Sequence, residues 1–257
     1  VMTRNAQAFI TPLTFQTLSG NPVTTELFNL IAESQIGHIA LADRAEVLAI
    51  APATANIIGK IAAGIADDML TTIVMATQAP VLLAPAMNVH MWENKICQET
   101  IQKLRSRGYH FIDPDAGELA CGYEGKGRLA EIPAIVEEIR VLLSPKDFSG
   151  EKVLVTAGPT EEPIDPVRFL SNRSSGKMGF ALARAARRRG AEVTLISGPT
   201  ALAAPPQMRH IAVRSATQMR EAVMNNLERA AILILAAAVS DYRPKQKAAE
   251  KIKKSKP

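Results

Sequence analysis

The chain has 257 residues, of which 47% are hydrophobic and 21% charged, and this composition excludes an intrinsically disordered chain. Aromatic residues make up 4%, too few for a nucleic-acid binder that stacks bases, so we expect no nucleic-acid partner. The net charge of +5 is small, and binding of a phosphate-bearing small molecule explains it as well as nucleic-acid binding would. Two cysteines cannot form a disulfide framework, and neither a signal peptide nor an apolar run of about 20 residues is present, so we expect a cytoplasmic protein with no membrane partner.

The first half of the chain alternates short apolar runs with helical patterns. Buried strands are predicted at Val47–Ala51, Val81–Ala84 and Tyr109–Ile112. Helices are predicted after each of them, at Thr54–Ala66, Met91–Arg107 and Ile132–Leu143, with Gly108 as a C-cap. This rhythm indicates βαβ units and a parallel sheet that helices cover on both faces.

A polar stretch with proline and glycine, Ser144–Gly150, is predicted to be a linker. After it the rhythm restarts, with strands at Lys152–Ala157, Glu192–Ser197 and Ile232–Ala237 and helices at Met178–Arg189 and Thr217–Glu228. The expected fold class is α/β with two doubly wound, Rossmann-like parallel-sheet domains, at residues 1–145 and 150–257. Both domains are expected to be incomplete, with a βα unit before Val1 and further chain after Pro257.

Two similar loops follow the first two predicted strands. Ligands of open α/β sheets bind at the carboxyl ends of strands, where helix N-termini present free N–H groups. In APATAN, residues 51–56, Thr54 is expected to cap a helix and Asn56 to lie in its first turn. In APAMN, residues 84–88, Asn88 begins the next helix. Together the loops predict a cofactor site, although each polar residue alone also suits an ordinary N-cap.

Two further residues of the first half are candidates for chemistry. His38 lies between a glycine and an apolar run, where a packed histidine is the alternative to a catalytic one. Cys121 lies in LACGYEGKGR, whose glycines predict a mobile flap, and the nearby Lys126 and Arg128 make its thiol a candidate functional group. Cys97 lies within a helical pattern and is expected to be a buried small hydrophobe.

Three segments of the second half suit anionic ligands. TAGPT, residues 156–160, follows a strand and supplies a tight turn, but it matches no established phosphate-loop motif. SNRSSGKMG, residues 171–179, places hydroxyls, an amide and Lys177 at a helix N-terminus. The last segment, residues 236–257, leaves a strand through Asp241 into a lysine-rich loop. That loop is either solvated surface or a clamp for a triphosphate.

Taken together, these segments resemble two known enzyme families. GHIAL, APATANIIGKIAAGIADDML, APAMNVHMW and ACGYEGKGRL resemble, in order and spacing, the flavin-dependent cysteine decarboxylases. TAGPTEEPIDPVRFLSNRSSGKMG, AAAVSDYRP and EKIKK resemble the phosphopantothenoylcysteine synthetases. Their order is similar to that of the bacterial bifunctional enzymes of coenzyme A biosynthesis. The resemblance implies a flavodoxin-like decarboxylase domain at residues 1–145 and a CTP-binding ligase domain at residues 150–257.

For the first domain, the resemblance implies FMN-dependent decarboxylation of 4′-phosphopantothenoylcysteine to 4′-phosphopantetheine. Hydride transfer from the thiol-bearing carbon to the flavin allows loss of CO₂ to leave a stabilised enethiolate. His38 matches the histidine of this oxidative step, Asn88 the amide that holds the substrate carboxylate, and Cys121 the late proton donor. The matching flavin contacts are Thr3, Thr54, Ala55, Asn56 and Ala86. The family's glycine-rich phosphate loop is expected before Val1.

For the second domain, the resemblance implies ligation of cysteine to 4′-phosphopantothenate with CTP and Mg²⁺, through an acyl cytidylate. Lys251 matches the lysine that is required to form this intermediate, and Asn172 matches the asparagine that handles it. The matching CTP pocket consists of Ala236, Ala237, Asp241 and Lys251. The resemblance identifies no metal ligands in this sequence.

The resemblance also implies a homo-oligomer, trimer-based through the decarboxylase domain and dimeric through the ligase domain. A non-catalytic regulatory flavoprotein of the same fold is an alternative, which the presence of His38, Asn88 and Cys121 disfavours. A peptidyl-cysteine decarboxylase or a flavin prenyltransferase is a second alternative. The synthetase-like half disfavours both enzymes, because it would supply a decarboxylase with its own substrate.

Overall fold

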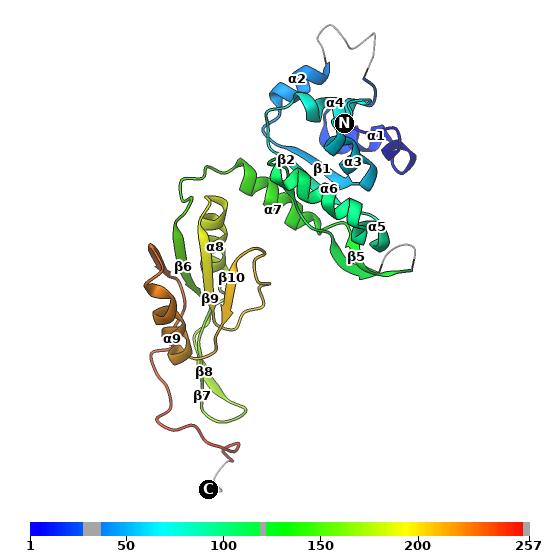
Figure 1. Ribbon diagram of the computed structural model, residues 1–257. Helices are drawn as coiled ribbons and strands as arrows, with labels where there is room; N and C mark the ends of the chain where they lie inside the picture. The colour runs from blue at the N-terminus through cyan, green and yellow to red at the C-terminus, as the bar shows by residue number, and fades with distance from the viewer. Residues whose placement is uncertain (28–36, 119–121, 254–257) are drawn as a thin grey trace. The chain divides into compact units, whose positions relative to one another are not determined.

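The computed structural model describes residues 1–27, 37–118 and 122–253 (Figure 1). The chain divides into two compact units, Val1–Leu143 and Ser144–Pro257. Each unit contains a parallel sheet with helices packed on it. The expected fold class, α/β with two parallel-sheet domains, is therefore confirmed.

The first unit is built on a three-stranded parallel sheet. Its order is β1 (Leu48–Ala53), β2 (Val81–Pro85) and β3 (His110–Phe111). An antiparallel hairpin follows, formed by β4 (Asp115–Glu118) and β5 (Glu124–Arg128). The helices are η1 (Ala6–Ala8), α1 (Pro12–Ser19), α2 (Gly37–Arg44), α3 (Ala55–Ala63), α4 (Met69–Ala76), α5 (Val89–Glu93), α6 (Lys95–Ser106) and α7 (Ile132–Leu143).

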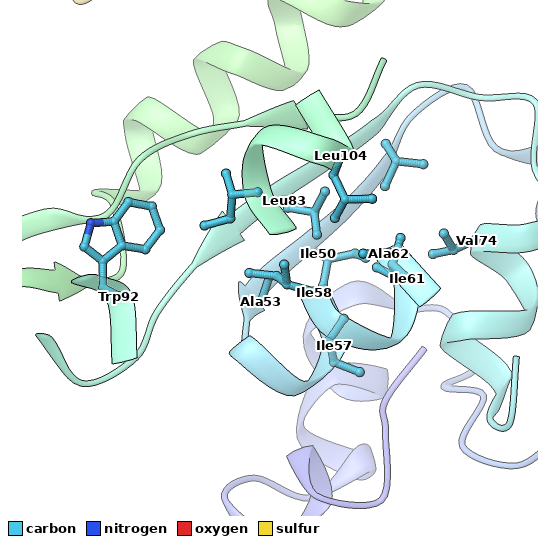
Figure 2. Close-up of a cluster of buried hydrophobic side chains, with 12 residues drawn as sticks. Ile50, Ala53, Ile57, Ile58, Ile61, Ala62, Val74, Leu83, Trp92 and Leu104 are labelled. Atoms are coloured by element: carbon cyan, nitrogen blue, oxygen red, sulfur yellow. The ribbon is translucent and has the colours of Figure 1, made fainter. Parts of the chain in front are cut away.

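The middle strand, β2, is buried along its whole length because helices cover both of its faces. Leu83 points to one face and packs with Ile58 of α3 and Leu104 of α6 (Figure 2). Leu82 points to the other face and packs with Ile135 of α7. Burying one such side chain contributes about 1.5–3 kcal/mol, which explains why the strand is uniformly apolar.

Two differences from the predicted elements of the first unit have a clear local cause. β1 continues through Pro52 to Ala53; a proline is tolerated there because β1 lies at an edge of the sheet and its register with β2 shifts at this point. The helix predicted at Met91–Arg107 is divided into α5 and α6. Asn94 leaves the helical conformation, with ψ of 130°, and its Oδ1 accepts a hydrogen bond from the Ile96 N–H to cap α6.

The second unit is built on a four-stranded parallel sheet. Its order is β10 (Arg209–Ala212), β9 (Glu192–Ser197), β6 (Lys152–Ala157) and β11 (Ile232–Leu235). Helix α8 (Lys177–Arg188) packs on one face through Phe180, and α9 (Ala216–Leu227) packs on the other through Met219. A short antiparallel hairpin, formed by β7 (Glu161–Pro163) and β8 (Phe169–Ser171), follows β6.

The strand order of the second unit reverses direction at β6. The chain passes from β6 to β9 on one side, and β11 pairs with β6 on the other side. The carboxyl ends of β6 and β11 therefore form a topological switch point, which is the usual ligand crevice of an open α/β sheet. Strand β11 ends at Leu235 instead of the predicted Ala237, because the amides of Ala236 and Ala237 bond to a threonine hydroxyl at this point.

Candidate functional site

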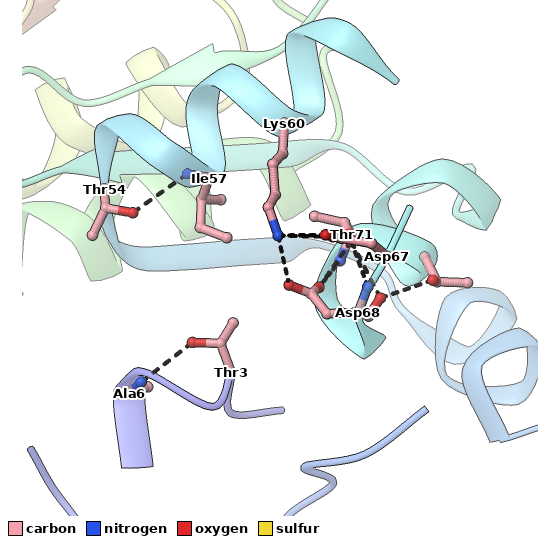
Figure 3. Close-up of polar contacts among 9 residues, drawn as sticks. Thr3, Ala6, Thr54, Ile57, Lys60, Asp67, Asp68 and Thr71 are labelled. Carbon is pink, nitrogen blue, oxygen red and sulfur yellow. Dashed lines mark hydrogen bonds and ion pairs between the residues drawn. The ribbon is translucent and has the colours of Figure 1, made fainter. Parts of the chain in front are cut away.

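In the first unit, the loops after β1 and β2 meet at the carboxyl edge of the sheet. The Ala86 N–H donates a hydrogen bond to the Ala53 carbonyl over 3.1 Å. Thr54 Oγ1 accepts from the Ile57 N–H over 3.4 Å and caps α3 (Figure 3), and Asn88 Oδ1 accepts from the His90 N–H over 2.9 Å. The structure thus gathers five predicted site residues at one edge: Thr54, Ala55, Asn56, Ala86 and Asn88.

The β4–β5 hairpin is attached to the residues that flank Asn88. The Met87 N–H donates to the Gly127 carbonyl over 2.9 Å. Gly125 has a φ of +154°, and a Cβ there would lie 2.7 Å from Val89 Cγ2, so any larger residue would displace the hairpin from α5. Residues 124–128 of the predicted flap therefore form a paired strand, β5. Cys121, between them, lies outside the described residues.

His38 lies in the first turn of α2, which packs on α4 through Ala42, Met69 and Ile73. Its Nδ1 atom is buried and has no hydrogen-bond partner among the residues that the structure describes. An unsatisfied buried polar atom costs about 1–3 kcal/mol, so this nitrogen is suited to meeting a polar group of a ligand or of another chain. None of the hydrogen bonds recorded for the described residues joins His38 to the edge formed by Ala53 and Ala86.

Thr3 belongs to a different part of the first unit. Its Oγ1 accepts from the Ala6 N–H over 3.3 Å, as Figure 3 shows. It lines a hollow of about 330 Å³ together with Met2, Arg4 and the segment 67–70. Beside this hollow, Lys60 forms an ion pair with Asp67 at 2.7 Å, and this hydrogen bond holds the pKa of the Asp67 carboxyl below its usual value. In the described part of the chain, no hydrogen bond links Thr3 to the β1–β2 edge.

In the second unit, a segment after β11 is held against the loop after β6. Thr156 Oγ1 accepts hydrogen bonds from the N–H groups of Ala236 and Ala237, at 3.2 and 3.3 Å. Thr160 Oγ1 accepts from the Ser240 N–H over 2.9 Å. These two threonines fix the backbone of residues 236–240 at the switch point, and Asp241 follows directly with its side chain exposed.

Asn172, which directly follows β8, also contacts the segment of residues 236–240. Its Nδ2 donates to the Val239 carbonyl over 2.9 Å, across a separation of 67 residues. The neighbouring Ser171 hydroxyl donates to the Thr160 carbonyl over 2.8 Å. The structure therefore brings together Asn172, Ala236, Ala237 and Asp241, four of the residues that the sequence assigned to the second site.

The start of α8 lies close to two strand-end loops. Gly176 has a φ of +73°, and a Cβ there would lie 2.7 Å from Thr200 Cγ2 and 3.4 Å from the Gly158 Cα. The hydroxyls of Ser174 and Ser175 accept hydrogen bonds from the amides of residues 176 and 177. The sequence predicted that N–H groups at this helix N-terminus bind an anion. In the structure, two of these N–H groups donate to the serine hydroxyls instead.

Lys251 has an exposed side chain and follows the segment of residues 236–241 along the chain. The next residue, Ile252, donates its N–H to Asp165 Oδ2 over 3.2 Å and accepts from the Arg168 guanidinium over 3.0 Å. Arg168 also holds the pKa of the Asp165 carboxyl far below its usual value, and backbone donors add to this effect against the opposing desolvation. Sequence analysis missed Asp165, for which an Asp-Pro turn signal was available.

No group of three or more histidine, cysteine or acidic side chains in residues 1–27, 37–118 and 122–253 is arranged to hold a metal ion. Within these same ranges, no helix has the length and apolarity needed to cross a membrane.

Comparison with known proteins identifies the class to which this fold and these strand-end sites belong. Residues 1–144 match the family described as Flavoprotein, and residues 148–257 match the DNA/pantothenate metabolism flavoprotein C-terminal domain. The chain belongs to the flavoprotein family. Over nearly its whole length it is similar to the coenzyme A biosynthesis bifunctional proteins CoaBC.

The similarity to these curated relatives is high but covers only part of their length. The chain is 50% identical over 256 residues to the protein of Vibrio cholerae serotype O1, covering 100% of this chain and 64% of the relative. It is 47% identical over 254 residues to that of Escherichia coli strain K12, covering 98% and 63%. A solved structure, the FMN binding protein AtHal3, is 34% identical, with 54% of this chain and 77% of that chain covered and a TM-score of 0.46. The family membership rests on the sequence matches.

Proposed function

We propose that this protein acts twice in coenzyme A biosynthesis. Its second unit ligates cysteine to 4′-phosphopantothenate with CTP, and its first unit decarboxylates the product, 4′-phosphopantothenoylcysteine, with FMN. The observation that carries the proposal is the convergence, at the carboxyl ends of strands, of Thr54, Ala86 and Asn88 in the first unit and of Asn172, Ala236 and Ala237 in the second. The chain is also similar throughout to bifunctional proteins.

The first unit has groups that fit FMN. The small residues Ala55 and Ala86 allow a flat ring system to approach the backbone, and Thr54 adds a hydroxyl. The buried Nδ1 of His38 has no hydrogen-bond partner within the described ranges and fits the polar edge of a ligand. When bound, FMN supplies an acceptor for the hydride of the thiol-bearing carbon.

The chain's own residues then have distinct tasks in the decarboxylase. His38 takes part in proton transfer during the oxidative step. The cap at α5 holds Asn88 Oδ1 on the backbone, so binding of the substrate carboxylate is the task of its Nδ2 donor. Cys121 donates a proton in the last step of the reaction, after CO₂ has left. Strands β4 and β5 flank Cys121 in the sequence, and β5 is bonded to Met87. The hairpin is therefore attached next to Asn88, the residue proposed to bind the carboxylate.

In the ligase, two displacements occur in succession. A carboxylate oxygen of 4′-phosphopantothenate attacks the α-phosphorus of CTP and pyrophosphate leaves; the cysteine amine then attacks the acyl carbon and CMP leaves. Lys251 neutralises charge on the polyphosphate in the first displacement, and Asn172 holds the acyl cytidylate for the second. Mg²⁺ binds mainly through substrate phosphates in such sites, with one or two carboxylates, and Asp241 is the carboxylate at this strand end.

A single incubation tests the proposed function. The protein at its full natural length, given 4′-phosphopantothenate, cysteine, CTP, Mg²⁺ and FMN, is expected to release CMP and CO₂ in equal amounts. Supplied with 4′-phosphopantothenoylcysteine alone, it is expected to release CO₂ without CTP. A regulatory flavoprotein would bind flavin and release neither product, and a peptidyl-cysteine decarboxylase would release CO₂ only from a peptide. Either result would contradict the proposal.

We further propose that FMN binds at an interface between subunits of a homo-oligomer that is trimer-based through the first unit and dimeric through the second. The Nδ1 atom of His38 supports this, because none of the hydrogen bonds of the described residues joins it to the β1–β2 edge. We expect light scattering to give a trimer or a multiple of it, and dilution to smaller species to release FMN. A monomer that remains fully flavin-loaded and active would contradict the interface site.

A further inference from the structure

The turn between β7 and β8 contains a completely buried carboxylate. The side chain of Asp165 has no solvent exposure and accepts five hydrogen bonds. Oδ1 accepts from the N–H groups of Val167 and Arg168, both at 2.8 Å. Oδ2 accepts two bonds from the Arg168 guanidinium, at 2.9 and 2.6 Å, and one from the Ile252 N–H. Four of the five bonds close the turn itself, and the fifth leaves it.

The fifth bond connects the turn to a segment 87 residues further along the chain. Arg168, oriented by Asp165, donates to the Ile252 carbonyl over 3.0 Å, so the pair binds both backbone groups of Ile252. The Ala248 N–H also donates to the Ile164 carbonyl over 3.0 Å. The segment 248–252 has no regular secondary structure. Its attachment to the β7–β8 turn is therefore what limits the backbone conformations open to Lys251.

The same hairpin carries Asn172 at its other end. Asn172 follows β8 and bonds to the Val239 carbonyl, whereas Asp165 lies in the turn and bonds to Ile252. The rigid β7–β8 pair thus sets the spacing between Asn172 and the backbone of Lys251. These two residues serve consecutive displacements on one substrate, so their spacing matters to the reaction.

We propose that Asp165 is a positioning residue for Lys251, holding its segment on the β7–β8 turn so that the lysine ammonium reaches the CTP polyphosphate. This inference rests on the proposed ligase function. Asp165 touches no reacting atom and acts through the Ile252 backbone. Without this attachment Lys251 remains in the chain, but its ammonium is spread over many positions, and misplacement by about 1 Å costs on the order of a hundredfold in rate.

The test measures pyrophosphate release from CTP and 4′-phosphopantothenate, with cysteine omitted and with the protein at its full natural length. Asp165→Asn is expected to lower the rate on the order of 10- to 100-fold. In the Lys251→Gln background the same substitution is expected to cause no further loss, because Asp165 acts only through that lysine. Amide hydrogen exchange of residues 248–253 is expected to accelerate in Asp165→Asn, while that of β6 and β9 stays unchanged.

A second variant removes one bond of this connection, the bond to Asp165, without altering the turn. Ile252→Pro deletes the N–H that donates to Asp165 and leaves the bonds within the turn in place. Like Asp165→Asn, it is expected to lower the rate of pyrophosphate release. It therefore tests the proposal even if Asp165→Asn unfolds the second unit. The matched control is Asp147→Asn, which breaks a bidentate pair with Arg189 elsewhere in this unit and is expected to leave the rate unchanged.

Each outcome has a distinct consequence. If the unsubstituted protein releases no pyrophosphate, the proposed function fails, and this inference fails with it. If the unsubstituted protein is active and both Asp165→Asn and Ile252→Pro release pyrophosphate normally, the inference alone is overturned. Additive losses in the Asp165→Asn, Lys251→Gln double variant would also overturn it, since they would show that Asp165 contributes independently of the lysine.

Discussion

His38→Asn is expected to stop the decarboxylase before CO₂ is released, whereas Cys121→Ser is expected to release CO₂ and then stall. In the proposed mechanism, the carboxylate cannot leave until the thiol-bearing carbon has been oxidised, and His38 acts in that first step. Cys121 is proposed to supply a proton only after CO₂ has gone. Because proton transfer by a positioned side chain contributes about 10²–10⁴-fold, we expect 4′-phosphopantetheine formation to fall by at least a hundredfold in both variants.

Flavin absorbance and CO₂ release distinguish the two stages. His38→Asn is expected to leave the flavin oxidised, and Cys121→Ser to accumulate an oxidised enethiol product. His110→Asn and Cys97→Ser are the matched controls. Cys97 is half-buried, with its Sγ 3.8 Å from Met87 Sδ, and burial raises the pKa of its thiol, so it is a poor proton donor. A block before CO₂ release in both His38→Asn and Cys121→Ser would refute the late role of Cys121.

In the ligase, Lys251→Gln is expected to abolish pyrophosphate release, whereas Asn172→Asp is expected to let the acyl cytidylate form and accumulate. In the proposed mechanism, the lysine ammonium stabilises charge that is redistributed on the polyphosphate in the first displacement. Losing one such charge-assisted contact costs about 3 kcal/mol, on the order of a hundredfold in rate. Asn172 lies at the end of β8, bonded to the Val239 carbonyl, and is proposed to act on the intermediate after pyrophosphate has gone.

The competing explanation is that Lys251 is one of several solvated lysines. Lys253 is also exposed and lies two residues away, so Lys253→Gln is the matched control and is expected to release pyrophosphate at nearly the normal rate. The assay omits cysteine, so it isolates the first displacement. Normal release by Lys251→Gln would show that its charge is not used, and equal losses in both variants would point to a general effect of net charge.

Local patterns predicted the elements that are buried by neighbouring helices. The bounds of β6, β9 and α7 agree with the predictions because strand and helix periodicities are properties of short windows of sequence. The cap at Thr54 was predictable for the same reason, since the capping hydroxyl bonds to an amide only three residues away. Helix α4 was not predicted, although the capping box of Asp68 and Thr71 is a local signal for it.

Short and exposed elements could not be predicted in this way. The strands β4, β5, β7 and β8 have 3–5 residues each, and each pairs with one other short strand. The glycine-rich segment around β5 read as an irregular flap because glycine weakens any strand pattern. Its pairing depends on β4 and on the close approach of α5, which no short window of sequence contains.

The sequence by itself determined two parallel-sheet domains, their buried strands and the residue types at each strand end. Only the tertiary structure decided which of these residues meet. Thr156 bonds to the amides of Ala236 and Ala237 across 80 and 81 residues, Asn172 to Val239 across 67, and Asp165 to Ile252 across 87. The physical reason is that a side-chain bond to a distant backbone group leaves no periodic trace in the sequence. It forms only after strand order and register have brought the two segments to the same edge of the sheet.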